Sequence, residues 1–249
     1  MAFDEKILAS LTRRVEPTAY LRCTPIAHRA TPLGMGYGKT RFASPDDSFK
    51  LLYIAEDLPT SIAEAIVRDR FESVMPREML RADFADWGVC EVSAKVPLKV
   101  LDLRRDGCFK LGVSTDIVGA KAQLEARAFS QSVHDGTDLD GILYFSRLRR
   151  RECLAIYERA ATSDLSASDV VELESLGGLV RALRSLKIRL FSDLPGGTVR
   201  ISVCGGAVDH QAVMALMKRS PKSTANCAFA MFHSRGGIFH SFSDRFKIR

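Results

Sequence analysis

The 249-residue chain lacks several features that would assign it to a class at once. No apolar run approaches the roughly 20 residues that a transmembrane helix needs, so we expect no membrane association. The N-terminal stretch has acidic residues and no long apolar segment, so we expect no signal peptide and a cytoplasmic protein. Apolar residues make up 46% of the chain and charged residues 27%, which is typical of a soluble globular protein with a real core.

Cysteine and histidine are present, but not in the patterns of disulfide or metal sites. The six cysteines are scattered with no C-x-x-C pair, and no two of the five histidines have the close spacing of a zinc site. We therefore expect free, mostly buried thiols and no bound metal. The G-x-S-x-G and H-E-x-x-H motifs are also missing, so the sequence lacks the motifs that carry the usual serine hydrolase and zinc protease sites.

The net charge of +6 is unevenly distributed. Residues 176–249 hold twelve Lys and Arg against three Asp, a net +9, so the rest of the chain carries −3. Such a basic stretch can bind nucleic acid or another acidic partner. Four of these cations lie close together in the sequence, at Arg181, Arg184, Lys187 and Arg189, where the simpler interpretation is the solvated face of a helix.

Short apolar segments alternate with helical patterns along the chain. This alternation predicts a mixed α/β or α+β fold with no internal repeat. We expect strands at 18–25, 50–57, within 89–103, at 141–146, 151–160 and 198–205. We expect helices at 59–71, 116–134, 166–187 (broken near Gly177) and 209–219, and a hairpin at 228–240.

A glycine-rich segment, Gly34-Met-Gly-Tyr-Gly-Lys-Thr40, is similar to a phosphate-binding loop but does not match one. The P-loop pattern requires glycine at position 33, where this chain has Leu33. The residues that follow Thr40 include Pro45 and cannot open a long helix. The glycine spacing also fails the dinucleotide fingerprint. We therefore predict a flexible loop, which can still border a ligand.

Five short signatures follow one another in a particular order. They are Tyr20-Leu21-Arg22, Thr40-Arg41-Phe42, Leu52-Tyr53-Ile54-Ala55, Ala63-Glu64-Ala65 and the run from Asp140 to Arg147 that contains Ser146. Each signature is weak alone, but the ordered set is fairly specific. Over roughly residues 18–162 it resembles the RES domain, a family named after its Arg, Glu and Ser.

The resemblance implies a fold similar to that of ADP-ribosyltransferases, with a NAD⁺ cleft in a mixed sheet. It implies cleavage of NAD⁺ at the bond between nicotinamide and ribose, and a toxin that an Xre-like antitoxin neutralises. We expect residues 1–190 to form the NAD⁺-binding catalytic domain. Residues 191–249 are then a basic C-terminal extension that packs on the same domain, docks the antitoxin or completes a homo-oligomer.

The resemblance assigns five site residues, and their chemistry agrees with it. Arg22 and Arg41 flank one glycine-rich loop and offer forked donors to a diphosphate. Tyr53 can stack on the nicotinamide ring. Glu64 can stabilise the positive charge that develops on the ribose, bind its hydroxyls or activate an acceptor. Ser146 ends a strand, where its hydroxyl can bind the nicotinamide amide or a phosphate. Arg22, Tyr53 and Glu64 are the expected catalytic residues.

Each assignment has a simpler structural alternative. Ser61-x-x-Glu64 fits a helix capping box, in which Glu64 only stabilises the start of a helix. The two arginines can be solvated surface charges, Tyr53 can be core packing, and Ser146 an ordinary hydroxyl at a strand end. Three acceptors also stay open for the ADP-ribosyl group, namely water, phosphate and a protein side chain. We favour degradation of NAD⁺ by water or phosphate over protein ADP-ribosylation.

Overall fold

The computed structural model describes residues 3–191, and the chain divides into two compact units. The first unit comprises Met1–Arg77 and Phe84–Ile188, and the second comprises Glu78–Asp83 and Arg189–Arg249. The described residues of the second unit supply most of a two-stranded sheet of β4 (Arg77–Leu80) and β11 (Ile188–Phe191), whose first residues, Arg77 and Ile188, belong to the first unit. All five candidate site residues belong to the first unit.

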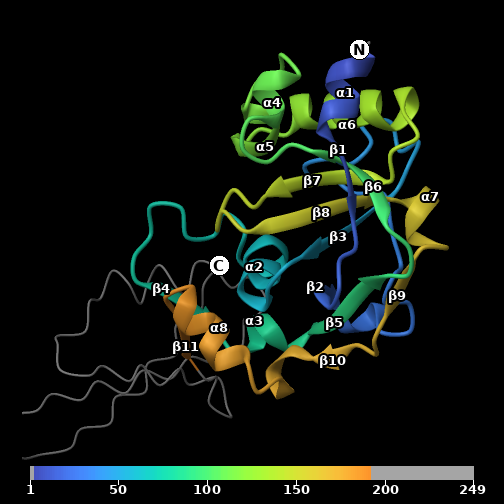
Figure 1. The fold of residues 1–249 in the computed structure, drawn as a ribbon. Coiled ribbons are helices and arrows are strands. Elements are labelled where there is room, and N and C mark those ends of the chain that lie inside the picture. Colours follow the sequence, from blue (N-terminus) through green and yellow to red (C-terminus); the bar gives the residue numbers. More distant parts are fainter. Residues whose placement is uncertain (1–2, 192–249) are drawn as a thin grey trace, which may run out of the picture. The chain divides into compact units, whose positions relative to one another are not determined.

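The first unit is built on a mixed sheet of nine strands (Figure 1). Their order is β1-β6-β7-β8-β3-β2-β5-β10, and β9 also pairs with β5. The β6–β7 pair is parallel, and the other pairs are antiparallel. The strands are β1 (Thr12–Val15), β2 (Tyr20–Pro25), β3 (Leu51–Ala55), β5 (Trp87–Ala94), β6 (Leu98–Asp102), β7 (Gly141–Phe145), β8 (Glu152–Tyr157), β9 (Leu165–Ala167) and β10 (Val171–Glu172).

Short helices connect these strands. The longest is α6 (Leu124–Gly136), and Figure 1 shows it close to α1 and β7. The others are α1 (Glu5–Leu11), η1 (Ile26–His28), α2 (Leu58–Ile62), the π-helix η2 (Ala63–Val67), α3 (Ala82–Ala85), α4 (Gly107–Lys110), α5 (Asp116–Gly119), α7 (Glu158–Ala161), η3 (Leu173–Ser175) and α8 (Leu179–Ser185). The predicted mixed α/β class is confirmed. Within residues 3–191, we find no helix with the length and apolar character that a bilayer crossing demands.

The core consists of two hydrophobic clusters, one on each face of the sheet. Leu51 and Ala55 of β3 belong to the first cluster, which also holds Phe129 of α6. Leu52 and Ile54 of the same strand belong to the second cluster. Since successive side chains of a strand point to opposite faces, both faces of β3 are covered. This explains why the segment reads as a continuous apolar run rather than an alternating one.

The sheet is weakest where β2 meets β3. These two strands share one register pair, Leu21 with Ala55, whereas β2 pairs with β5 over six residues. Beyond that pair, the N–H of Cys23 donates to Oγ of Ser61 at 2.8 Å. Helix α2 therefore supplies a hydrogen-bond partner for β2 where β3 no longer does, and α2 leads directly into η2 and Glu64.

Three predicted helices need correction. The helix expected to reach Phe71 ends at Val67, because Arg68 donates its N–H to Ala63 and adopts a φ of 49°. The helix expected at 116–134 is two helices, because Ala120 is extended (ψ 155°). The segment 166–187 is α-helical only in α8 and has one short 3-10 helix, η3, while its first half adds β9 and β10 to β5. Pairing with an available sheet edge there overrides local propensity.

The strand predicted at 151–160 ends at Tyr157, where α7 begins. The strands predicted at 18–25, 50–57, within 89–103 and at 141–146 are confirmed as β2, β3, β5 with β6, and β7. The elements predicted at 198–205, 209–219 and 228–240 lie outside the described residues.

Candidate active site

The carboxylate of Glu64 is fixed by the hydroxyl of Ser146. Glu64 is half-buried on η2, and Ser146 is fully buried directly after β7. The Ser146 Oγ donates to Oε1 of Glu64 at 2.5 Å. The same oxygen accepts the N–H groups of Leu148 at 3.2 Å and Arg149 at 3.1 Å. A hydroxyl has one proton and two lone pairs, so these three contacts use its full capacity.

The capping-box interpretation of Glu64 is wrong. Helix α2 begins after Asp57, whose carboxylate accepts the N–H of Thr60 at 2.7 Å and serves as the N-cap. Ser61 lies inside this helix and accepts the N–H of Cys23 instead. Glu64 therefore lies in η2, beyond the end of α2, and does not cap the start of α2.

Tyr53 connects β3 to the end of the glycine-rich loop. Its hydroxyl accepts hydrogen bonds from the Thr40 hydroxyl at 2.9 Å and from the Phe42 N–H at 3.1 Å. Burial raises the pKa of Tyr53 to about 12, so the phenol is neutral at physiological pH. Its ring also packs against the first core cluster. Core packing is thus part of its role, while the hydroxyl holds the loop.

Arg41 lies beside Glu64 and Tyr53. Its Nη2 donates to the carbonyl of Ala120 at 2.7 Å, and its Nη1 to that of Ile117 at 3.3 Å. Burial lowers the pKa of Arg41, and the nearby Glu64 acts in the opposite direction. A guanidinium still keeps its charge at neutral pH. The site therefore holds a fixed positive charge close to a fixed carboxylate.

Tyr144 is a member of this cluster that sequence reasoning missed. Burial raises the pKa of Tyr144 well above its ordinary value, and Glu64, Tyr53 and Arg41 all interact with it electrostatically. Its ring packs edge-to-face on Phe42, with the ring centroids 5.0 Å apart. The available signal was its position two residues before Ser146 along one strand, because such residues share a face.

Arg22 has a different environment from the other four candidates. Its Nη2 donates to the carbonyl of Gly34 at 2.6 Å, at the start of the glycine-rich loop. Gly34 is needed there, because a Cβ would lie 2.8 Å from the carbonyl oxygen of Thr31. The neighbour of Arg22 on β5 is Cys90, a member of the second core cluster. The structure thus brings Arg41, Tyr53, Glu64 and Ser146 together, whereas Arg22 contacts the glycine-rich loop and Cys90.

Arg22 also holds an unused donor. Its Nη1 is buried and has no hydrogen-bond partner among the described residues. Burial lowers the pKa of Arg22 for the same reason, since the charged group has lost water. Both Arg22 and Arg41 are half-buried, so neither is a freely solvated surface charge. A buried unsatisfied donor is costly, and an anionic ligand would satisfy it.

The described part of the chain contains four of the six cysteines. Cys23, Cys90, Cys108 and Cys153 are free thiols, and three of them are buried, which confirms the expectation for these four. Between residues 3 and 191, no three His, Cys, Asp or Glu side chains are grouped as metal ligands.

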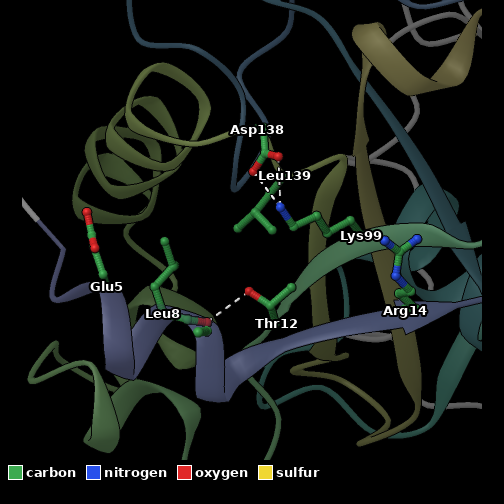
Figure 2. A pocket seen from close by; sticks show the side chains of 8 residues that line it. Glu5, Leu8, Thr12, Arg14, Lys99, Asp138 and Leu139 are labelled. Atoms are coloured by element: carbon green, nitrogen blue, oxygen red, sulfur yellow. Dashed lines mark hydrogen bonds and ion pairs between the residues drawn. The ribbon is translucent and has the colours of Figure 1, made fainter.

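A separate cavity of about 390 Å³ lies between α1, β1 and β6 (Figure 2). Its polar wall is an ion pair in which Lys99 Nζ contacts both carboxylate oxygens of Asp138 at 2.7 Å. None of the five candidate residues lines this cavity. It is lined by Glu5, Leu8, Ala9, Thr12, Arg14, Lys99, Asp138 and Leu139.

The fold and the cluster define a mixed α/β protein whose polar site combines a fixed carboxylate, a guanidinium and two phenols. The RES domain profile matches residues 12–175, and the chain belongs to the RES domain family. This confirms the resemblance predicted over residues 18–162.

One solved structure adds to the assignment of the fold. A chain in the crystal structure of the M. tuberculosis MbcT–MbcA toxin–antitoxin complex is similar to this protein, with a TM-score of 0.54 and 18% sequence identity. The match covers 74% of this chain and 100% of that chain. At this identity, the likeness shows a common fold. No curated protein matches the chain.

Proposed function

We propose that this protein is a toxin of a toxin–antitoxin pair and that it degrades NAD⁺ by breaking the bond between nicotinamide and ribose. The observation that carries the proposal is the half-buried Glu64 carboxylate, held by Ser146 at 2.5 Å beside Arg41 and Tyr53. Membership of the RES domain family supports it, as does a common fold with a chain of a toxin–antitoxin complex.

Glu64 would stabilise the transition state of this cleavage. The glycosidic bond breaks with its electron pair leaving on nicotinamide, and positive charge develops on the ribose. A carboxylate that is already oriented stabilises that charge without having to reorganise. The hydrogen bond from Ser146 provides this orientation. We therefore assign Ser146 as a positioning residue for Glu64, because its hydrogen bonds are already used within the protein.

The remaining residues would hold the substrate. The buried Nη1 of Arg22 has no partner in the described part of the chain and suits a phosphate oxygen, and Arg41 supplies a second guanidinium at the other end of the glycine-rich loop. The ring of Tyr53 would stack on nicotinamide, while its hydroxyl keeps Thr40 and Phe42 in place. This arrangement suits NAD⁺, whose diphosphate lies between two sugar groups.

We propose water or inorganic phosphate as the acceptor of the ADP-ribosyl group, and protein ADP-ribosylation as the alternative. The purified protein should be incubated with NAD⁺ in the presence and absence of phosphate, and the products separated by mass. Free nicotinamide with ADP-ribose indicates hydrolysis, and with phosphorylated ADP-ribose it indicates phosphorolysis. A mass increase on a protein indicates transfer to a side chain. If NAD⁺ stays intact in every condition, the proposal fails.

The proposal includes an Xre-like antitoxin as partner, a cytoplasmic location and a catalytic domain in residues 1–190. A basic nucleic-acid module is less well supported. In α8, Arg181 and Arg184 are exposed, whereas Leu179 and Leu183 are buried, which is the ordinary pattern of a solvated helix face. The rest of the basic stretch, residues 192–249, lies outside the described residues. Absence of binding to DNA or RNA at low salt would remove this alternative.

A further inference from the structure

Two cations near the candidate site are neutralised by carboxylates of one loop. This loop, residues 68–75, directly follows η2 and its Glu64. Its Asp69 forms an ion pair with Arg147, and its Glu72 forms one with Lys121, with Nζ and Oε2 2.5 Å apart. Both pairs are solvent-accessible, with 27% to 61% of each side chain exposed.

Both cations come from segments that the candidate residues already contact. Arg147 directly follows Ser146, which holds Glu64. Lys121 directly follows Ala120, whose carbonyl accepts a hydrogen bond from Arg41. Arg147 is also close enough to Arg41 to affect it electrostatically. The loop therefore connects two segments that border the same site.

We propose that Arg147, with Lys121 beside it, is a further binding residue for the diphosphate of a dinucleotide, and that Asp69 and Glu72 occupy these cations until the ligand arrives. The inference rests on the proposed function. Charge supports it, because a bridging diphosphate carries two negative charges, the number that the two carboxylates supply. Geometry supports it for Arg147, because a guanidinium matches phosphate oxygens with two parallel donors.

Replacing the carboxylates of Asp69 and Glu72 by a phosphate ligand requires little free energy. Ion pairs between exposed side chains add little net stability, so breaking them for a ligand costs little. The backbone of the loop forms local hydrogen bonds, such as Glu72 N–H to Asp69 and Val74 N–H to Phe71, both at 3.3 Å. It begins at Arg68, whose positive φ of 49° marks the end of η2. The loop can therefore shift without breaking a register pair of the sheet.

Substituting the two partners of the Arg147–Asp69 ion pair should change ADP affinity in opposite directions, and this provides the test. The probe is ADP, a diphosphate without nicotinamide, and its affinity is measured by calorimetry. Arg147→Gln should weaken ADP binding by about tenfold or more, because a charge-assisted hydrogen bond is lost. Asp69→Asn should strengthen ADP binding by about threefold, because the competing carboxylate is gone. Glu72→Gln should act in the same direction as Asp69→Asn.

Arg150→Gln is the matched control. Arg150 lies in the same turn, is exposed and forms no ion pair within residues 3–191, so its loss should change ADP affinity by less than about twofold. Thermal unfolding of each variant shows whether it folds. The inference is overturned if Arg147→Gln binds ADP like the parent, or if Asp69→Asn weakens binding as Arg147→Gln does, since a merely structural pair predicts that result.

Failure of this inference and failure of the proposed function look different. If ADP binding changes in opposite directions but NAD⁺ stays intact, the proposed cleavage fails and the binding role of Arg147 stands. If NAD⁺ is cleaved but Arg147→Gln leaves ADP affinity unchanged, the binding role fails and the proposed function stands.

Discussion

The Ser146 hydroxyl donates to Glu64 at 2.5 Å while it accepts two backbone N–H groups of the turn after β7. The orientation of the carboxylate is therefore coupled to the hairpin that joins β7 to β8. Misplacing a reacting group by about 1 Å can cost about a hundredfold in rate. The proposed chemistry thus depends on a serine whose own hydrogen bonds are already satisfied.

Glu64→Gln should reduce NAD⁺ cleavage by at least about a hundredfold, because a neutral amide cannot stabilise a developing positive charge. Its shape is nearly that of Glu, so the melting temperature should change little. Glu125→Gln, an exposed carboxylate in the first turn of α6, is the control and should retain full activity. Cleavage is measured as nicotinamide release. Activity of Glu64→Gln equal to that of the parent would remove Glu64 from the mechanism.

Ser146→Ala should lower kcat by about tenfold to a hundredfold with a smaller change in KM. The substitution lets the Glu64 carboxylate change its orientation but removes no contact with the substrate. It should also cost about 1–3 kcal/mol of stability, because two N–H groups lose their acceptor. Ser130→Ala is the matched control. Ser130 is equally buried, and its Oγ lies 3.1 Å from the Tyr157 hydroxyl. It should lose stability but keep kcat, and equal losses of kcat in both variants would contradict the positioning role.

The sequence allowed the mixed fold class, four of the strand segments and the family to be predicted, because apolar runs and ordered short motifs are local signals. The helix at 116–134 was wrong because Ala120 is extended and its carbonyl binds Arg41, a residue far away in the sequence. The first half of 166–187 was wrong because β5 offered an edge for pairing. Whether these segments form a helix or a strand depends on contacts with residues far away in the sequence, which a local pattern does not contain.

The candidate site was only partly predictable for the same reason. Motif order predicted Arg41, Tyr53, Glu64 and Ser146, which the fold brings together. It could not show that Ser146 is buried and holds Glu64, because that contact joins residues 82 positions apart. It also missed Tyr144, because a buried tyrosine in an apolar strand looks like ordinary core.

Arg22→Met should abolish NAD⁺ cleavage while changing the melting temperature by no more than about 4 °C. The substitution removes the buried, unpaired Nη1 donor and keeps a similar apolar stem, but it also removes the hydrogen bond from Nη2 to the Gly34 carbonyl, so a gain and a loss of stability offset each other. Arg77→Met is the control, because Nε of Arg77 is also buried without a partner in the described part of the chain. It should keep full activity. A strongly destabilised Arg22→Met would show that this residue is structural.

Two substitutions of Tyr53 should separate the roles of its ring and its hydroxyl. Tyr53→Phe removes the acceptor for Thr40 and Phe42, which should cost about 1 kcal/mol of stability but change kcat/KM less than about fivefold. Tyr53→Ala should lose cleavage, because no ring is left to stack on nicotinamide. Steady-state kinetics and urea unfolding measure both effects. Equal activity of the two variants would contradict the stacking role.

Asp57→Ala should destabilise the protein by about 1 kcal/mol at pH 7, because α2 loses its N-cap. Burial alone would raise the pKa of Asp57, but hydrogen bonds from Thr60 and the charge of Arg149 outweigh it and lower the pKa below its ordinary value of 3.8. A depressed pKa contributes stability that is present above the unfolded value and lost as pH falls through the folded value. The difference between parent and Asp57→Ala should therefore shrink below about pH 4.

Urea unfolding at pH 7 and pH 3 measures this pH dependence. Asp57→Asn is the control, because asparagine caps helices as well but does not titrate. Its stability relative to Asp57→Ala should be the same at both pH values. A constant difference between the parent and Asp57→Ala across this range would contradict the role of the ionised cap.

The most direct test of the account is cellular NAD⁺ after induced expression of the protein. NAD⁺ should fall in cells that express the parent chain and stay at the uninduced level in cells that express Glu64→Gln to the same amount. Unchanged NAD⁺ in cells that express the folded parent chain, or an equal fall with Glu64→Gln, would contradict the account.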